Sequence, residues 1–506
     1  MQYANPASSS HPFYKAIIGL LIVTLVLAPV FRAGNTPLAS LMLQWLGIVI
    51  LVVTLWTPRA VPLSRVEFGI LVLLGLVPIL YLIPLPGAFV NGLPGRDLYV
   101  AGEALLSLDT SSAWKPLSIH PDLTVAAGLS LLIPLAVFVG TRSLDSRGLL
   151  LLVKVLLGVA LVQAILGLIQ FGTVQSGAML MAVPGGHPDS ATGTYANRNH
   201  LAGLLAMMLP LALAMLYYNL GHEDSTGGPR SGTWRRRARF LGSTHGNAAI
   251  LYGAVALLIL VGLVFTRSRM GIAMGMLGLI LTTLLFARRI GGSNTFGITG
   301  TVVAVTLGFG VAIGLAPVLD RFTVTGVVED ARVDLFSATL LRLGELLPVG
   351  SGPGTFPSAF LPVQPIQFGG LLANHAHNDY LEWISDAGLI AAVIILVALA
   401  FYAHQWTRVY VRGHWSRSRF LQAGAGVGLL VLALHELVDY NLAIPANQAV
   451  LAFLAGIFFM PPERLETTTE RRSRRRTPDL EPPTPMRAQG VAPQPDQIPN
   501  PFQDAR

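Results

Sequence analysis

The sequence predicts an all-α integral membrane protein with about twelve transmembrane helices. Hydrophobic residues make up 53% of the 506 residues, the mean hydropathy is +0.61, and charged residues make up only 12%. These values lie far from those of an average soluble domain. Apolar stretches of membrane-spanning length also recur along the whole chain. The composition, the mean hydropathy and the recurring apolar stretches together determine the predicted fold class.

Each apolar stretch comes close to the length that a membrane-crossing helix needs, roughly 17–25 residues. In chain order the stretches are Ala16–Phe31, Leu38–Trp56, Phe68–Pro86, Leu123–Thr141, Gly148–Phe171, Leu201–Tyr218, Ala248–Thr266, Gly271–Ala287, Ile298–Leu315, Ala387–Gln405, Phe420–Leu437 and Gln448–Met460. The last stretch is short. No small-residue cleavage site followed by a soluble domain comes after the first, so we expect it to be a retained helix.

The distribution of positive charge predicts the orientation of these helices. With the N-terminus inside, about 24 of the 34 Lys and Arg residues lie in inside loops or tails, and about nine lie outside. Basic residues are favoured on the cytoplasmic side of a membrane. We therefore expect both termini in the cytoplasm. The formal charge of +8 reflects this topology and is poor evidence for nucleic-acid binding.

Three outside segments are long, at residues 87–122, 172–200 and 316–386. The first contains a candidate short helix at Asp97–Leu108. The third, of about 70 residues, is the only candidate for a soluble subdomain. Within it, Val333, Phe336 and Leu340 recur at helical spacing and predict an amphipathic helix that lies on the membrane or on the bundle and ends before Pro348.

The tail beyond Pro461 is rich in proline and carries an arginine cluster at residues 471–476. We expect it to be disordered, with the arginines against anionic lipid. The chain contains no cysteine, which excludes disulfides, thiolate catalysis and cysteine-ligated metal sites.

A polar segment directly precedes one predicted span and is the first candidate for chemistry. Residues 374–380 contain His375, His377, Asn378 and Asp379 within a chain that has few charged residues. His377 is a candidate general base, because imidazole titrates near neutral pH. His375 lies two residues away, so a metal site formed by the two histidines is an alternative. A structural role for either histidine is also open. Asn378 and Asp379 are also candidate caps of the following helix.

Arginines at the outside ends of spans form a second candidate group, because topology disfavours them there. They are Arg198, Arg267 and Arg269. A guanidinium is permanently charged, and its planar donor fork suits phosphate oxygens, so three of them predict an anion site without a metal. Contact of the arginines with lipid phosphates is the alternative.

Two further segments contain residues of interest. Residues 350–356 are glycine-rich, but they lack the Gly-Lys-Ser/Thr ending of a phosphate loop, so we exclude a nucleotide site and expect at most a turn with amides facing an anion. His435, Glu436, Asp439 and Asn441 fall at the end of a span, where a functional and a structural role are both open.

Four segments together resemble the O-antigen ligase and polymerase family of bacterial polysaccharide assembly. They are Gly193-Thr194-Tyr195-Ala196-Asn197-Arg198-Asn199-His200-Leu201-Ala202, Ser268-Arg269-Met270-Gly271, the glycine-rich residues 348–356, and His375-Ala376-His377-Asn378-Asp379-Tyr380-Leu381-Glu382. The resemblance covers roughly residues 193–406. The glycine after Arg269 is displaced by one position from the family pattern, and the basic tail is not part of that pattern.

The resemblance implies a GT-C-like glycosyltransferase in the bacterial inner membrane. The donor would be an undecaprenyl-diphosphate-linked glycan, used on the periplasmic face without metal or cofactor. The acceptor would be lipid A-core, protein or another glycan. By this resemblance His377 is the base and Arg269 is the best-matched phosphate ligand. Further substrate-binding residues are expected, namely Arg198, Arg267, Arg332, His375, Asn378, Asn199 and His200.

The resemblance also implies an organisation of the chain. Residues 1–192 would hold the first five helices, and residues 193–406 a catalytic region that includes the periplasmic loop 316–386. Residues 407–460 would hold the last two helices, and residues 461–506 the cytoplasmic tail.

A twelve-span transporter is the alternative function, because a basic loop joins two sets of six spans. The polar residues cluster at outside loops, however, whereas a carrier places them near the midplane.

Overall fold

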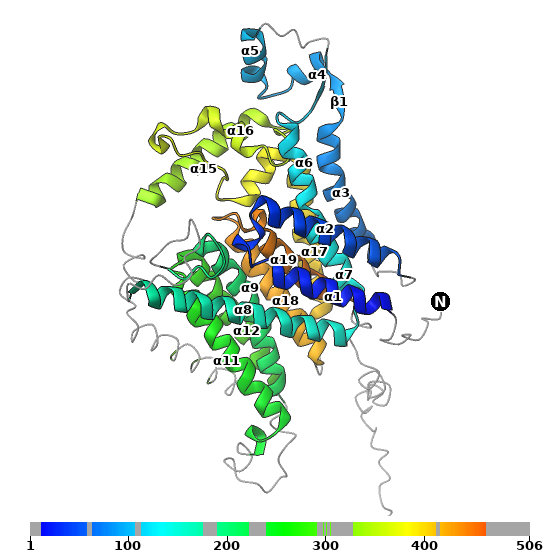
Figure 1. Cartoon of the computed structure of the whole chain (residues 1–506), viewed down its shortest axis with the longest axis vertical. Helices are drawn as coiled ribbons and strands as arrows, with labels where there is room; N and C mark the ends of the chain where they lie inside the picture. The colour runs from blue at the N-terminus through cyan, green and yellow to red at the C-terminus, as the bar shows by residue number, and fades with distance from the viewer. Residues whose placement is uncertain are drawn as a thin grey trace, which may run out of the picture. The chain divides into compact units, whose positions relative to one another are not determined.

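The computed structural model shows a predominantly helical chain (Figure 1). It describes residues 12–57, 63–106, 113–175, 190–221, 239–290, 327–410 and 415–461, and the single positions 297, 300 and 304. Within these ranges nine helices are long and apolar enough to cross a membrane, and two shorter apolar helices accompany them. The all-α membrane fold is thus confirmed. Most of the expected span at 298–315 and the tail from residue 462 lie outside the described residues, so twelve spans remain a prediction.

The first part of the chain places four candidate spans around a small hairpin. Its elements are α1 (Pro12–Leu27), η1 (Arg32–Gly34), α2 (Pro37–Leu55), α3 (Arg65–Leu82), β1 (Pro84–Pro86), α4 (Gly87–Asn91), α5 (Asp97–Leu105), β2 (Trp114–Pro116), α6 (Pro121–Ser130), α7 (Leu132–Arg142) and α8 (Ser146–Gln175). The helix expected at Asp97–Leu108 corresponds to α5. Strands β1 and β2 pair antiparallel, with Leu85 opposite Lys115.

The second part contains the segments on which the family resemblance rests. Its elements are α9 (Arg198–Leu220), α11 (Thr244–Phe265), α12 (Arg269–Ile290), α15 (Val327–Leu346), α16 (Phe356–Phe360), η3 (Leu361–Val363), η4 (Ile366–Phe368), α17 (Asp379–Val409), α18 (Arg417–His435), η5 (Asn441–Ala443) and α19 (Pro445–Phe458).

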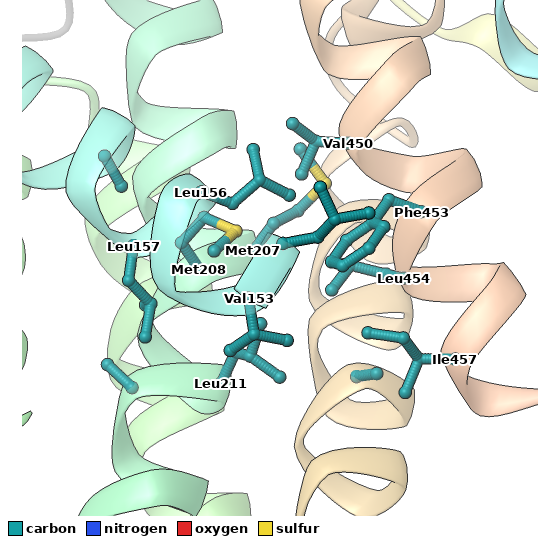
Figure 2. Close-up of a cluster of buried hydrophobic side chains, with 14 of the residues drawn as sticks. Val153, Leu156, Leu157, Met207, Met208, Leu211, Val450, Phe453, Leu454 and Ile457 are labelled. Atoms are coloured by element: carbon teal, nitrogen blue, oxygen red, sulfur yellow. The ribbon is translucent and has the colours of Figure 1, made fainter. Parts of the chain in front are cut away.

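Helix α9 is the centre of the bundle. It is apolar on all sides, and 94% of its apolar segment is buried, whereas only 22% of that of α3 is buried. A helix that is hydrophobic all round belongs in an interior. It contacts α8, α11, α12, α18 and α19. Figure 2 shows its Met207, Met208 and Leu211 between Leu156 of α8 and Phe453 of α19.

Small residues let neighbouring helices approach α9 closely, as is common in membrane bundles. A Cβ added to Gly424 of α18 would lie 2.7 Å from the Cβ of Ala214, and one added to Gly428 would lie 2.7 Å from the Met207 carbonyl oxygen. Larger side chains at these glycines would push α18 away from α9.

Helix α17 differs from the span expected at Ala387–Gln405. It begins at Asp379, and its backbone is interrupted at Ala387 and Gly388, where Gly388 has φ of +58°. The added turns carry polar residues, so hydropathy could not reveal them. These residues are buried because Asp379 contacts the segment that joins α18 to α19, whereas Ser385 and Asp386 contact the glycine-rich loop 350–354.

Candidate functional site

The segment before α9 is held by two glutamines of α8. Gln163 Oε1 accepts from the Thr194 amide at 3.0 Å, and Gln170 Nε2 donates to the Gly193 carbonyl at 2.7 Å. Asn197 then caps α9, because its side-chain oxygen accepts from the Asn199 amide at 2.9 Å. These contacts fix where Arg198, Asn199 and His200 begin the helix. An N-cap of this kind stabilises a helix by about 1 kcal/mol.

The segment with His375 and His377 is held by the first turn of α17. Glu382 Oε1 lies 2.9 Å from His375 Nδ1, and Glu382 Oε2 accepts from the Ala376 amide at 2.8 Å. Asn378 caps α17, accepting from the Leu381 amide at 3.1 Å. Of the two candidate caps, Asn378 therefore has this role, and Asp379 lies inside the helix.

His377 has an unusual backbone conformation. Its φ is +52°, in the left-handed region that residues other than glycine seldom adopt. Histidine occurs in this region more often than most other such residues. Such residues occur often at functional sites, where the surrounding structure holds them in place. Here the Glu382 contacts on one side and the Asn378 cap on the other supply that constraint.

The segment that joins α18 to α19 is locked to α9 by Asn447. This fully buried side chain donates to the His200 carbonyl and to Asn441 Oδ1, both at 3.0 Å, and accepts from the Tyr195 hydroxyl at 3.1 Å. The Asn441 amide in turn donates to Glu436 Oε2 at 2.7 Å. One amide side chain thus joins the start of α9 to the α18–α19 segment.

A carboxyl pair joins the same segment to α17. The Asp379 amide donates to the Glu436 carbonyl at 3.1 Å, and the Leu442 amide donates to Asp379 Oδ2 at 2.9 Å. The carboxyl group of Asp379 also neighbours that of Glu436. Burial raises the pKa of Glu436, which lies beyond the end of α18, to about 7.

These connections bring three imidazoles around one buried carboxylate, Asp439. His377 Nδ1 lies 3.7 Å and His200 Nε2 lies 4.0 Å from Asp439 Oδ1. His435 Nε2 lies 3.7 Å from Asp439 Oδ2. His200, His435 and Asp439 are buried, whereas His377 keeps 30% of its side chain exposed. Of these three histidines, His377 is therefore the one that a substrate can reach.

The neighbouring Tyr440 packs three histidine rings together. The His375 ring stacks on it with centroids 4.3 Å apart, and the rings of His200 and His377 each meet it edge-on at 4.7 Å. Tyr440 thereby gathers the two motifs 193–202 and 375–382 around one ring.

The charge state of Asp439 follows from this environment. Burial alone would raise its pKa, but the interaction with His377 and the charges that His435 and His200 can carry outweigh burial, so the pKa lies well below its ordinary value. Asp439 is therefore a carboxylate at neutral pH. It favours the His377 tautomer that carries its proton on Nδ1, which leaves Nε2 able to accept one.

Arg198 and Arg269 begin two helices whose first turns are in contact. Arg198 is the first residue of α9, and Arg269 is the first residue of α12. A Cβ added to Gly271 would lie 2.3 Å from the Cβ of Ala202, so α12 can meet α9 here only with glycine at this position. The glycine that is displaced from the family pattern thus has a packing role. Two half-buried arginines and two helix N-termini lie at this end of the bundle.

Arg267 has a different environment. Its φ is +55°, its side chain is 7% exposed, and its guanidinium carbon lies 5.1 Å from the centre of the Phe171 ring. This cation–π contact favours a role in holding the α11–α12 turn. Its predicted contact with phosphate stays a prediction. The backbone of Arg332 belongs to α15, but its side chain lies outside the described residues.

The glycine-rich loop is tied to the interruption of α17. The amides of Ser351 and Gly352 donate to the carbonyls of Ser385 and Asp386 at 3.0 Å and 2.7 Å, and the Gly354 amide donates to Asp386 Oδ2 at 2.7 Å. Two of these amides bind backbone carbonyls, and the third binds the side chain of Asp386. They therefore leave no binding place for phosphate.

The sequence identified both histidine motifs and left a role for Asp439 open, but it did not single out Tyr440 or Glu382 as site residues. His435, Glu436, Asp439 and Asn441 had drawn attention because ionisable side chains are unusual at the end of a span. Among the described residues, no group of three or more His, Asp or Glu side chains is arranged to hold a metal ion.

The nine candidate spans in the described part of the chain are those of a multi-pass membrane protein. Residues 254–396 match the family model of the O-antigen ligase, which supports assignment of the chain to the O-antigen ligase and polymerase family. The match contains Arg269, His375 and His377 but not the segment 193–202 or Asp439. No curated protein matches the chain.

Proposed function

We propose that this protein transfers a glycan from an undecaprenyl-diphosphate donor to an acceptor hydroxyl on the periplasmic face of the inner membrane. The observation that carries the proposal is the position of His377 Nδ1, 3.7 Å from Oδ1 of the buried Asp439. The family match supports the reaction class, and the resemblance of the four motifs supports the identity of the donor.

His377 is the proposed base. With its Nδ1 directed at Asp439, its Nε2 accepts the proton of the incoming hydroxyl. Asp439 stabilises the imidazolium that forms, as the carboxylate does in other base–carboxylate pairs. His200 and His435 share the same carboxylate and keep it ionised.

Arg198 and Arg269 are the proposed ligands of the donor diphosphate. Two guanidiniums at the adjoining starts of α9 and α12, together with the N-terminal ends of these helices, favour phosphate charge. The charge on the diphosphate grows as it leaves, so these groups bind the transition state more tightly than the substrate.

The bond changes balance without a further reactant. The acceptor oxygen forms a bond to the anomeric carbon as its proton passes to His377. The bond between that carbon and the phosphate oxygen breaks, and its electron pair leaves with the lipid diphosphate. The polyprenyl tail stays in the bilayer while the glycan stays in water, which explains a site at the ends of the spans.

The size profile of lipid-diphosphate-linked glycans from cells without this protein tests the proposal. Long chains accumulate on the lipid if the protein is a ligase, whereas single repeat units accumulate if it is a polymerase. A profile equal to that of the parent cells overturns both assignments.

His377→Ala tests the assignment of the base. We expect transfer to fall by roughly 10²–10⁴-fold, the contribution of general base catalysis, with membrane insertion and expression unchanged. The measurement is glycan transfer by purified protein in vesicles. A variant of the exposed Asp122, Asp122→Asn, is the matched control. Transfer by His377→Ala at the rate of the wild type would remove His377 from the mechanism.

A further inference from the structure

Helix α15 exposes large apolar side chains and buries an arginine. The helix expected in this segment is present, and its inward side contains Thr339 and Arg342, 0% and 3% exposed, beside the buried Leu335 and Leu346. Arg342 Nε donates to the Ala359 carbonyl at 2.8 Å. The opposite side presents Val333, Leu340 and Leu341, which are between 55% and 69% exposed. A surface helix in water normally turns its charged residues outward.

The loop that follows α16 repeats this arrangement. Val363 and Phe368 pack inward on the cluster around Leu335 and Phe356. Ile366 is 95% exposed, and Leu371 and Leu372 are also largely exposed. Gln364 closes the loop, donating to the Leu371 carbonyl at 2.9 Å and accepting from the Ala373 amide at 3.0 Å. The exposed leucines and isoleucine are thus held outward by a defined structure.

The composition of the segment identifies what covers these side chains. No Asp, Glu, Lys or Arg occurs between Glu345 and Asp379. A protein interface retains charged residues at its rim, whereas a surface in contact with hydrocarbon lacks them. The segment also leads directly into α17, whose Leu389, Val393 and Leu396 are exposed at helical spacing, as lipid-facing residues of a span are.

We propose that α15 and the loop 361–372 rest on the membrane leaflet next to the site, with Leu340, Leu341, Ile366, Leu371 and Leu372 in contact with lipid hydrocarbon. The occupant of this apolar face is bilayer lipid. Because the loop ends three residues before His375, this contact sets the height of His377 at the level where the diphosphate of a membrane-anchored donor lies. The statement about lipid contact rests on the membrane fold, and the statement about height rests on the proposed function.

The chain has no native cysteine, so single-cysteine variants report on one position each. Ile366→Cys is labelled with an environment-sensitive fluorophore and reconstituted as the full-length protein in vesicles whose phosphatidylcholine is brominated in the acyl chains. Val393→Cys is the control within a span, and Asp97→Cys in α5 is the control in water. Ile366 touches little of the protein, so its replacement should leave folding intact.

We expect the label at Ile366 to be quenched to an extent similar to the label at Val393. Quenching no greater than that at Asp97 overturns the proposal, and labelling at Ile366 that is blocked only in native membranes would indicate a protein partner instead. Quenching requires no transfer activity, so this outcome is independent of the proposed reaction. Ile366→Asp should then lower transfer from a lipid-linked donor several-fold while His377 remains in place.

Discussion

Asp386 and Asp439 are both buried carboxylates next to a histidine motif, yet they bind different kinds of partner. Asp386 receives the Gly354 amide at 2.7 Å and lies beside Ser351. Asp439 is surrounded by His200, His377 and His435 at 3.7–4.0 Å. Both residues are at most 5% exposed.

The same side chain fixes a loop in one place, and in the other it has the partners that the proposed proton transfer requires. A backbone amide cannot release its proton, so the partners of Asp386 hold the loop 350–354 in one arrangement. An imidazole nitrogen can accept a proton, so a histidine beside Asp439 is chemically able to take part in proton transfer. The partner groups therefore separate the two functions.

Of the substitutions that test this comparison, Asp439→Asn should have the largest effect. An amide cannot stabilise an imidazolium and can favour the wrong tautomer of His377, so kcat should fall about 10²-fold with little change in KM. Steady-state transfer by purified protein measures both. Asp122→Asn serves again as the control. If kcat were unchanged and only thermal stability fell, Asp439 would be a structural residue like Asp386.

Asp386→Asn should mainly lower stability. Loss of the carboxyl oxygen that accepts from the Gly354 amide costs about 1–3 kcal/mol, and the activity of the folded protein should change little. Thermal unfolding in detergent and the rate per folded molecule separate these effects. A variant that is stable but inactive would contradict the structural role.

Glu382→Gln should have an intermediate effect on catalysis. It replaces one of the two oxygens that hold His375 and the Ala376 amide, while the backbone of α17 stays the same. Loss of one such bond corresponds to about a tenfold reduction in transfer, or ~1.4 kcal/mol. Glu382→Ala should reduce transfer further. Equal activity in both variants would show that the segment 375–377 is held by other contacts.

The smallest effect concerns pH. Burial raises the pKa of Glu436 from 4.5 to about 7, so the folded state holds this proton more tightly than the unfolded state. The free energy of unfolding should therefore fall as pH rises from about 4.5 to 7 and then level off. The Tm of Glu436→Gln should change with pH by a few degrees less than the Tm of the wild type over that range. Identical plots of Tm against pH for the two proteins would argue against a raised pKa of Glu436.

Hydropathy and motif spacing predicted the helical membrane fold, the amphipathic helix α15 and the segments around His200 and His377. They could not predict that Asp439 lies between those histidines, since the contact joins residues far apart in the sequence. Hydropathy placed the start of the span at Ala387, whereas the candidate caps Asn378 and Asp379 marked the actual start of α17, where Asn378 is the cap.

The orientation of α15 was likewise beyond the sequence. Apolar spacing predicted the stripe at Val333, Phe336 and Leu340, but not that the structure would bury Arg342 and leave the stripe exposed. That result depends on the Ala359 carbonyl, which accepts from Arg342 and comes from a different element, α16.

The segment between Pro348 and Asn378 is closed at both ends on the same helix. At one end Gly350 lies against the interruption of α17, where an added Cβ would be 2.5 Å from the Asp386 carbonyl oxygen; at the other, Asn378 caps the start of α17. The part in between forms a cassette with fixed attachment points. Exchange of residues 357–372 for a segment of different length would therefore change what borders the site while leaving its base and carboxylate in place, which offers a direct route to new acceptor specificity.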